Sequence, residues 1–249
     1  NQVTRLPPTL FSTQTRISIL RLSRNRLHTL PTHSLQSIST LRTIFCAHNH
    51  LTALPPEIIT NRPALRTLEF SHNPIRSIPP GLFRNSSGLE LLWLRNTHLT
   101  SLPPDVFQGL ENLQDLDLSY TPFGDRNAGV AVGNGGHVPP PLLTLTAQHL
   151  RSITSTANLD TLEVTNVALA EDVAEVLTSR LTLNTLRLGW AGMDDTHPAV
   201  AVLCDALSDR PRHLQVQLCF RHHHSLMRYV IARPSISTTM RLLTATHTG

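Results

Sequence analysis

The sequence of 249 residues contains no lysine and only three cysteines, and aromatic and charged residues make up just 4% and 15% of it. Cys46, Cys204 and Cys219 are too few and too scattered for a disulfide framework or a zinc site, so we expect small buried apolar side chains. No run of about 18 apolar residues occurs, which excludes a membrane-spanning helix. The hydrophobic content of 40% argues against disorder of the whole chain.

The motifs of several large enzyme classes are also missing. The sequence has no phosphate-binding loop, no GxSxG nucleophile motif and no HExxH zinc motif. We therefore assign no catalytic, metal-binding or cofactor-binding residue and expect a protein that is not an enzyme.

Charge is distributed unevenly along the chain. Residues 1–56 carry six arginines and no acid, residues 57–209 carry nine arginines and all 17 acids, and residues 210–249 carry six arginines and no acid. A surface with regions of opposite charge suits a charge-matched protein better than a long polyanion. The acidic middle therefore disfavours nucleic acid as the ligand.

A repeat with a constant step occupies the first half. Apolar residues alternate in short LxL units, and three positions after each unit an Asn or Thr recurs, at 25, 49, 73, 97 and 121. Four repeats continue to Leu-Pro or Ile-Pro, at 30–31, 54–55, 78–79 and 102–103. Counting back one step gives Asn1, so we expect the first repeat to be truncated and the natural protein to extend further.

Each part of the repeat has a physical reason. Alternating apolar residues predict a short strand with one face inward, and a repeat that cannot bury its apolar edge alone must stack on its neighbours. Asn suits the turn after the strand, because its side chain hydrogen-bonds nearby backbone and tolerates left-handed geometry. Stacking then predicts a ladder of Asn side chains that satisfies buried backbone groups. The proline ends the strand and starts an extended return path.

This pattern, LxxLxLxxNxLxxLP, resembles the leucine-rich repeat superfamily, and residues 102–110 (LPPDVFQGL) resemble its "typical" subclass. The resemblance implies an α/β fold, a right-handed solenoid or horseshoe with a parallel concave sheet and an extended or helical convex side. We expect about nine rungs in total.

The resemblance divides the chain into four parts. Residues 1–123 hold the typical repeats, and residues 124–141, with five glycines and three consecutive prolines, form a loop that interrupts the solenoid without ending it. Residues 142–220 resemble the ribonuclease-inhibitor type, with apolar positions at Leu162, at Leu186 and, after a longer step, at Leu214. Helical spacing at 172–181 and 199–207 predicts helices. Residues 221–249 are either a cap or a flexible tail.

The residues between the core positions should form columns on the concave sheet, with neighbours about 4.8 Å apart. Aromatic and arginine side chains are frequent anchors of protein interfaces, although the rings could instead cover neighbouring rungs. The gradient from arginine in the first rungs to acids in later rungs would orient a partner. We expect partner binding by Arg21, Arg24, Arg42, Phe45, His48, Arg66, Glu69, His72, Leu91, Trp93, Asp115, Asp117 and Tyr120.

Two places in these columns hold residue types that occur in metal-binding or catalytic sites. His48 and His72 should be vertical neighbours close to Glu69, but the spacing fixes no third metal ligand, and pH-sensitive binding is the milder alternative. Asp115 and Asp117 should lie about 6.5 Å apart on one strand face, within reach of two-carboxylate sugar hydrolysis. An open sheet offers no evident pocket to raise one carboxyl pKa, which argues against hydrolysis.

The resemblance implies a non-catalytic module that binds an unidentified protein ligand on the concave face, without a cofactor. The alternatives are a fragment of a receptor or adhesin ectodomain, and the substrate-recognition part of a larger enzyme or scaffold. The sequence does not fix the compartment. The second half is of a mostly intracellular subclass, which favours the cytoplasm over the cell surface or secretion. The sequon at Asn85 (Asn-Ser-Ser) would matter only in a secreted protein.

Overall fold

A computed structural model of the chain describes about three fifths of its residues. They are 1–14, 16–119, 130–132, 136–138, 144–152, 159–165, 168–169, 173, 176, 185–189, 215–219 and 240–242.

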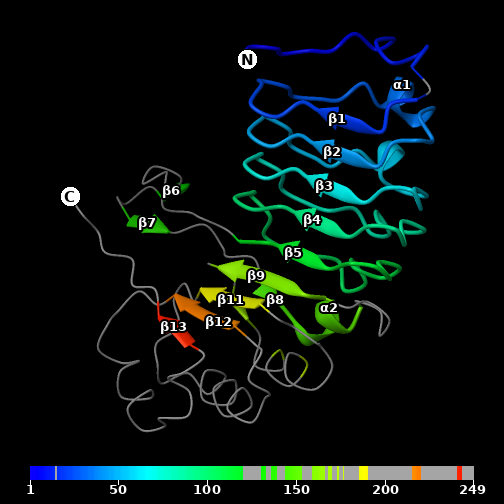
Figure 1. Cartoon of the computed structure of the whole chain (residues 1–249). Coiled ribbons are helices and arrows are strands. Elements are labelled where there is room, and N and C mark those ends of the chain that lie inside the picture. The colour runs from blue at the N-terminus through cyan, green and yellow to red at the C-terminus, as the bar shows by residue number, and fades with distance from the viewer. Residues whose placement is uncertain are drawn as a thin grey trace, which may run out of the picture.

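Nine of the described strands stack into one parallel sheet that runs from the first repeat to the last described residues (Figure 1). Its nine strands lie in the order β1-β2-β3-β4-β5-β9-β11-β12-β13, and each neighbouring pair is parallel. Their bounds are β1 Ile19–Arg21, β2 Thr43–Phe45, β3 Thr67–Glu69, β4 Leu91–Trp93, β5 Asp115–Asp117, β9 Thr161–Thr165, β11 Thr185–Gly189, β12 Gln215–Cys219 and β13 Met240–Leu242. Strand order follows chain order, which confirms the expected solenoid.

The constant step of the repeat becomes the register of the first five strands. Leu20 pairs with Ile44, Ile44 with Leu68, and so on to Leu116, so each rung places the middle residue of its LxL unit above the next. These five side chains are between 0 and 6% exposed and form one wall of the core. Cys46 also lies in the core, as expected, and burial followed by the charge of Glu69 raises the pKa of its thiol to about 12. Such a thiol is a packing residue and not a nucleophile.

A ladder of asparagines closes the turns after the first three strands. Asn49 Oδ1 accepts from the Leu27 N–H and Asn73 Oδ1 from the Leu51 N–H, each at 3.0 Å. Their Nδ2 groups donate to carbonyls of their own rung and of the rung before, as in the 2.9 Å bond from Asn73 to Cys46 O. The ladder thus satisfies backbone groups inside the core, as the repeat predicts.

The convex side is built from extended segments, turns and two short helices. Helix α1 spans Thr32–Gln36 and the 3-10 helix η1 spans Pro56–Ile58. The convex turns repeat left-handed backbone at Asn61, Asn85 and Gly109, whose φ angles are 58°, 56° and 88°. Asn and Gly are the residues that adopt this geometry at least cost, so the chemistry of the position matches its backbone.

The sheet continues past the Gly/Pro-rich segment because β5 pairs directly with β9. Within that segment, β6 (Val130–Val132) and β7 (Gly136–Val138) form an antiparallel pair. Strand β8 (Thr144–Leu145) pairs with β10 (Ala168–Leu169) in a separate two-stranded sheet, and helix α2 (Ala147–Arg151) follows β8.

The second half departs from the sequence expectation in its last step. Leu186 pairs with Val216, so the expected alignment of Leu186 with Leu214 is wrong by two positions. An apolar residue occurs at both positions, and alternation alone cannot choose between two registers that differ by two. Of the predicted helices at 172–181 and 199–207, only Val173 and Val176 are described. Both are helical and buried, and the rest of the two predictions lies outside the described residues.

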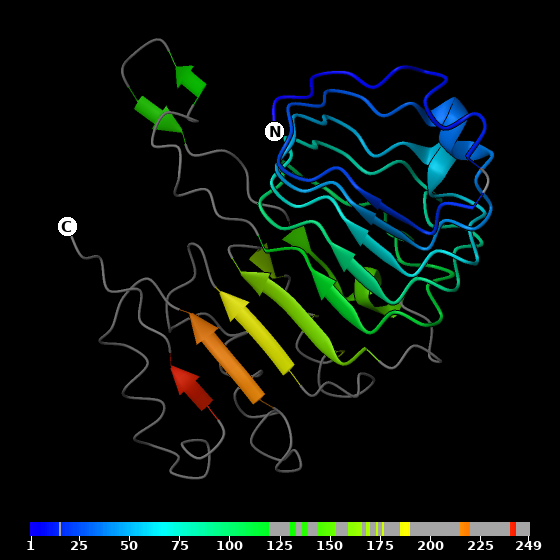
Figure 2. The same ribbon diagram turned by 45° about the horizontal axis from the view of Figure 1, so that its top comes forward.

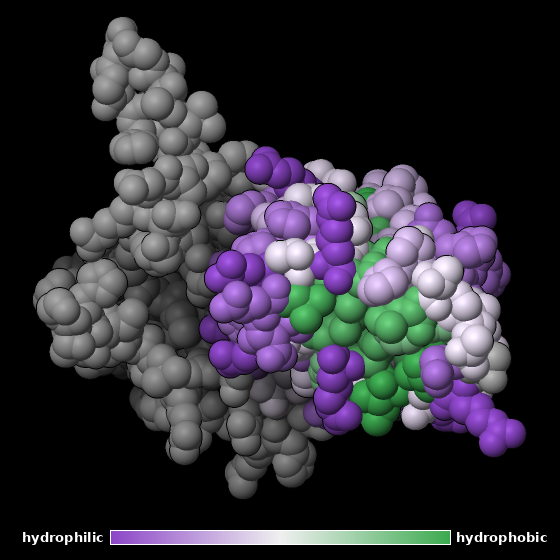
Figure 3. Space-filling view, turned by 90° about the horizontal axis from the view of Figure 1, so that it is seen from above, coloured by the Kyte–Doolittle hydropathy of each residue, from purple (hydrophilic) through white to green (hydrophobic). Residues whose placement is uncertain are grey.

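The N-terminal end of the solenoid exposes apolar surface (Figure 3). Among the described residues, the exposed large apolar side chains are Val3, Leu10 and Ile19, and Leu6 and Phe11 are partly buried against the core. No strand of the described part pairs with the outer edge of β1. In the same described ranges, no helix combines the length and apolar character that crossing a membrane requires.

Candidate protein-binding surface

Strands β1 to β5 lie side by side in one sheet (Figure 2). The exposed face of this sheet carries one column of alternating charged and aromatic residues, here called the central column. In the first five strands it runs Arg21, Phe45, Glu69, Trp93 and Asp117, each paired in register with the next. Arg21 is exposed and the other four are half-buried, so all five reach the surface. The column continues through Glu163 in β9 to Arg187 in β11.

Arginine and an aromatic ring meet at the N-terminal end of the central column. The Arg21 guanidinium carbon lies 5.5 Å from the centre of the Phe45 ring. This cation–π contact holds the arginine over the next rung and prearranges both side chains. The Phe45 ring therefore packs against a side chain of the neighbouring rung and still reaches the surface. Packing between rungs and exposure to a partner are thus compatible at this position.

Trp93 lies between two carboxylates further along the central column. Glu69 pairs with it on one side and Asp117 on the other. Burial raises the pKa of Glu69 and the charge of His48 partly offsets this. Burial also raises the pKa of Asp117, against a 2.8 Å hydrogen bond from the Ser119 N–H to Asp117 Oδ1. An indole flanked by two partly desolvated carboxylates is suited to a cationic side chain.

A second column, the left-handed column, lies where the strands turn into the Asn ladder. It consists of Arg24, His48, His72 and Asn96, with φ angles of 60°, 55°, 57° and 51°. The rings of His48 and His72 stack with centres 4.0 Å apart and planes 9° from parallel. Asn96 Nδ2 lies 3.0 Å from His72 Nδ1, so the amide donates to that ring nitrogen. The two histidines are therefore vertical neighbours, as expected, and they contact each other and Asn96.

His72 gives a testable dependence of stability on pH. Burial and then the charges of His48, Arg95 and Arg24 lower its pKa below the usual 6.5. The unfolded chain then takes up a proton at a pH at which the folded chain does not, so the free energy of unfolding decreases as the pH falls through 6.5. We expect His72→Asn to weaken this decrease, measured by urea unfolding between pH 7.5 and 5.5. Asn suits the left-handed backbone, as Asn96 shows. An equal pH slope in both proteins would contradict the assignment.

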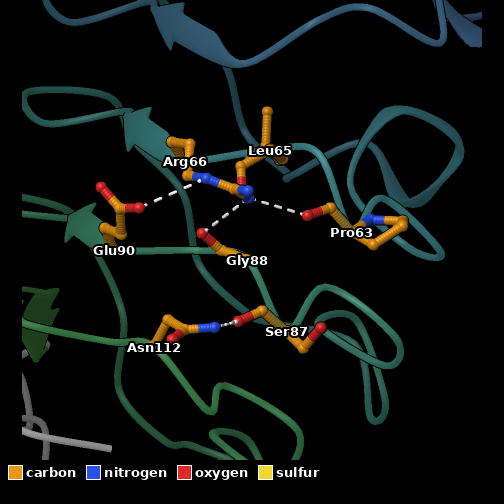
Figure 4. Close-up of polar contacts among 7 residues, drawn as sticks. All are labelled: Pro63, Leu65, Arg66, Ser87, Gly88, Glu90 and Asn112. Atoms are coloured by element: carbon orange, nitrogen blue, oxygen red, sulfur yellow. Dashed lines mark hydrogen bonds and ion pairs between the residues drawn. The ribbon is translucent and has the colours of Figure 1, made fainter.

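Arg66 is already engaged within the protein (Figure 4). Its Nη1 donates to the carbonyls of Pro63, Leu65 and Gly88, at 2.8, 3.2 and 3.1 Å, and its Nε lies 3.2 Å from Glu90 Oε1. The guanidinium thus joins two rungs at the start of their strands. This expected partner-binding residue lies at the sheet, but its guanidinium already binds backbone carbonyls of its own rung and of the next rung and the carboxylate of Glu90.

The remaining predicted residues are placed as follows. Arg42 is exposed one residue before β2, and Leu91 and Asp115 are half-buried in register with each other on β4 and β5. Asp115 and Asp117 share one strand face, as expected, and both lie on the open sheet. Tyr120 lies outside the described residues.

Sequence reasoning missed Arg95 and Arg62. Arg95 lies close enough to His72 and Asp117 to influence the pKa of both. The sequence contained a signal for Arg95, which is a long charged residue at a position where the neighbouring rungs hold the small residues Ala47, Ser71 and Ser119. Arg62 donates to the carbonyls of Leu35, Gln36 and Ile38 and so covers the C-terminal end of α1. Nothing in its sequence context indicated that role.

Within the described ranges, no three His, Cys, Asp or Glu side chains are grouped so that they could hold a metal ion. The surface offers charged, aromatic and imidazole groups on a parallel sheet. Such groups are suited to recognition by contact.

Comparisons with known proteins find a matching family model and solved structures of similar fold. A family model described as "Leucine rich repeat" matches residues 39–99 and 63–123. Two solved Drosophila structures are similar in fold. The Toll–Spatzle complex gives 19% identity over 89% of this chain and 31% of the other chain, with a TM-score of 0.56. Its glycosylated form gives 20% identity over 86% of this chain and 29% of the other chain, with a TM-score of 0.53. The chain thus spans about a third of the length of those it matches. No curated protein sequence matches.

Proposed function

Because this chain is a member of the leucine-rich repeat superfamily, we propose that it is a non-catalytic module that binds a protein partner on the concave face of its sheet. The observation that carries the proposal is the central column, in which the chain places Phe45 and Trp93 on exposed strands although it has only 11 aromatic residues. Aromatic and arginine side chains dominate the binding energy of protein interfaces.

The mechanism is recognition by a preformed surface. Parallel pairing fixes the strands, the Asn ladder fixes their turns, and the Arg21–Phe45 contact fixes two of the side chains. A partner then orders little on binding, which leaves more of the contact energy for affinity.

The order of charges along the central column suggests how the partner lies. Arg21 precedes Phe45 at one end, whereas Trp93 has Glu69 before it and Asp117 after it. Complementarity then places a basic side chain of the partner on Trp93 and an acidic region of the partner over the first rungs. In the opposite orientation, like charges would face each other on both ends.

The test is a pair of photo-crosslinking positions and one substitution. A crosslinking amino acid in place of Phe45 or Trp93 is expected to capture the same host protein, and the same amino acid at the convex residue Arg84 is expected not to. Trp93→Ala should weaken binding of that protein by about 2 kcal/mol, roughly 30-fold, measured by calorimetry. Arg84→Ala is the matched control and should bind normally.

Folding is checked separately by circular dichroism and the urea midpoint of each variant. Unchanged affinity after Phe45, Trp93 and Tyr120 are replaced together by alanine, in a protein that still folds, would move the interface away from this face. Equal crosslinking at Arg84 would do the same.

A receptor ectodomain is the second candidate. The solved chains with similar folds come from a complex of Toll with Spatzle, one of them in a glycosylated form. Asn85, the first residue of the Asn-Ser-Ser sequon, is exposed on the convex side, away from the central column. Expression in a secretory host with removal of N-glycans tests this candidate. A mass unchanged by the glycosidase would argue against it.

A further inference from the structure

The stacked pair His48–His72 lies among two cationic and two anionic groups. Arg24 precedes it in the left-handed column, and Arg95 approaches His72 from the turn after β4. Glu69 on β3 faces His48, and Asp117 on β5 faces Arg95. Protonation of both rings would therefore add two positive charges beside two guanidiniums, with two carboxylates nearby.

Stacking makes this arrangement sensitive to an external anion. Two imidazolium rings 4.0 Å apart repel each other. A carboxylate placed along the exposed edge of the stack would offset that repulsion and that of the arginines. The same carboxylate would accept hydrogen bonds from ring N–H groups, which on His72 means the Nε2–H, because Nδ1 faces the Asn96 amide.

We propose that an acidic segment of the protein partner lies along the left-handed column, over His48 and His72, and that its binding is coupled to proton uptake by the pair. This inference rests on the proposed function and adds the chemistry and the pH dependence of one part of the interface. Binding tightens as the pH falls from 7.5 to 6.0, because the complex holds protons that the free protein does not.

The neighbouring surface favours an acidic protein segment over a nucleic acid. The central column next to the histidines contains Glu69 and Asp117, and Glu90 lies at the start of β4. A long polyanion that followed the sheet would meet these carboxylates, whereas a few acidic side chains can stop at the histidines.

The backbone of the left-handed column provides a suitable substitution. Asn occupies the same position in the next rung, at Asn96, with φ 51°. The double variant His48→Asn/His72→Asn therefore keeps a residue that tolerates left-handed geometry and removes both titrating rings. The matched control is His28→Asn/His50→Asn, which removes a second ring pair, tilted by 32° with centres 5.3 Å apart.

The experiment uses an octaaspartate peptide as the probe, because its carboxylates stay ionised between pH 6.0 and 7.5. We expect calorimetry to give a dissociation constant about tenfold lower at pH 6.0 than at pH 7.5. Buffers of different ionisation enthalpy should reveal net proton uptake. The double variant His48→Asn/His72→Asn should lose the pH dependence, and His28→Asn/His50→Asn should keep it.

Three outcomes would overturn the proposal. The first is equal octaaspartate affinity, or no binding, at both pH values. The second is a pH dependence that persists without His48 and His72. The third is tighter binding of an octathymidylate strand than of octaaspartate, which would assign the column to nucleic acid.

This test is separate from that of the proposed function. The octaaspartate experiment measures anion binding at the left-handed column without the natural partner. The crosslinks and Trp93→Ala measure binding of the natural partner at the central column. If only the pH dependence of octaaspartate binding is absent, the proposed recognition on the concave face still stands. If only Trp93→Ala fails to weaken partner binding, that recognition is contradicted and the anion site still stands.

Discussion

Replacing Asn73 by alanine is expected to lower the free energy of unfolding by about 4 kcal/mol. Asn73 is 2% exposed and makes four side-chain hydrogen bonds, one from the Leu51 N–H and three to the carbonyls of Cys46, Phe70 and Ser71. Alanine removes all four and leaves the Leu51 N–H in the core without this acceptor. Urea unfolding followed by circular dichroism measures the loss.

The same substitution at Asn25 is the matched control. Asn25 holds the equivalent position in the first rung, but its bond from the Val3 N–H is longer, at 3.3 Å, and exposed. Water can replace that bond, so we expect Asn25→Ala to cost about 1 kcal/mol. Hydrogen exchange of the Leu51 amide should accelerate only in Asn73→Ala. Similar losses for both variants would mean that burial of the ladder does not set its contribution.

Gly88→Ala is expected to destabilise the protein by about 3 kcal/mol. A Cβ at Gly88 would lie 1.7 Å from Arg66 Nη1 and 2.1 Å from the Pro63 carbonyl oxygen (Figure 4). Arg66 would have to leave the carbonyls that it joins, and the backbone at Pro63 would have to move as well. The measurement is again the free energy of unfolding in urea.

A double-mutant cycle separates the two contacts. Arg66→Ala removes the side-chain clash but leaves the one with Pro63, so Gly88→Ala should cost less in the Arg66→Ala background without becoming neutral. Gly81→Ala is the control. Its Cβ would meet only the Arg84 side chain, at 3.6 Å or more, and the φ of +69° limits the expected loss to about 1 kcal/mol. A loss at Gly81 as large as that at Gly88 would contradict the steric account.

Much of the fold and part of the surface could be predicted from the repeat. The buried positions of the first five strands and the neighbours in the central column follow from stacking identical steps. The vertical contact of His48 with His72 follows in the same way. The ring orientation, the bond to Asn96 and the approach of Arg95 do not, because long or rotatable side chains are placed by several neighbours at once.

The Asn ladder is likewise predictable from the sequence only in part. Leu27 and Leu51 donate to Asn side chains of the next rung, as the repeat predicts. At the next step the repeat holds Thr97, and the Ile75 N–H donates instead to the backbone carbonyl of Asn73, at 2.8 Å. Thr97 donates to Leu94 O in its own rung. A shorter side chain cannot reach across the rung, so the backbone supplies the acceptor.

The sequence by itself determined that this chain forms stacked strands, which residues of the first five face the core, and which lie on the exposed face of the sheet. It could do so because a constant step converts spacing along the chain into contact between neighbours. Only the tertiary structure decided that β5 joins β9 across the Gly/Pro-rich segment, that Leu186 pairs with Val216, and that Arg66 binds the Gly88 carbonyl of the next rung. These depend on contacts between unlike segments, for which no period exists, and packing alone selects among the registers and rotamers that the local pattern allows.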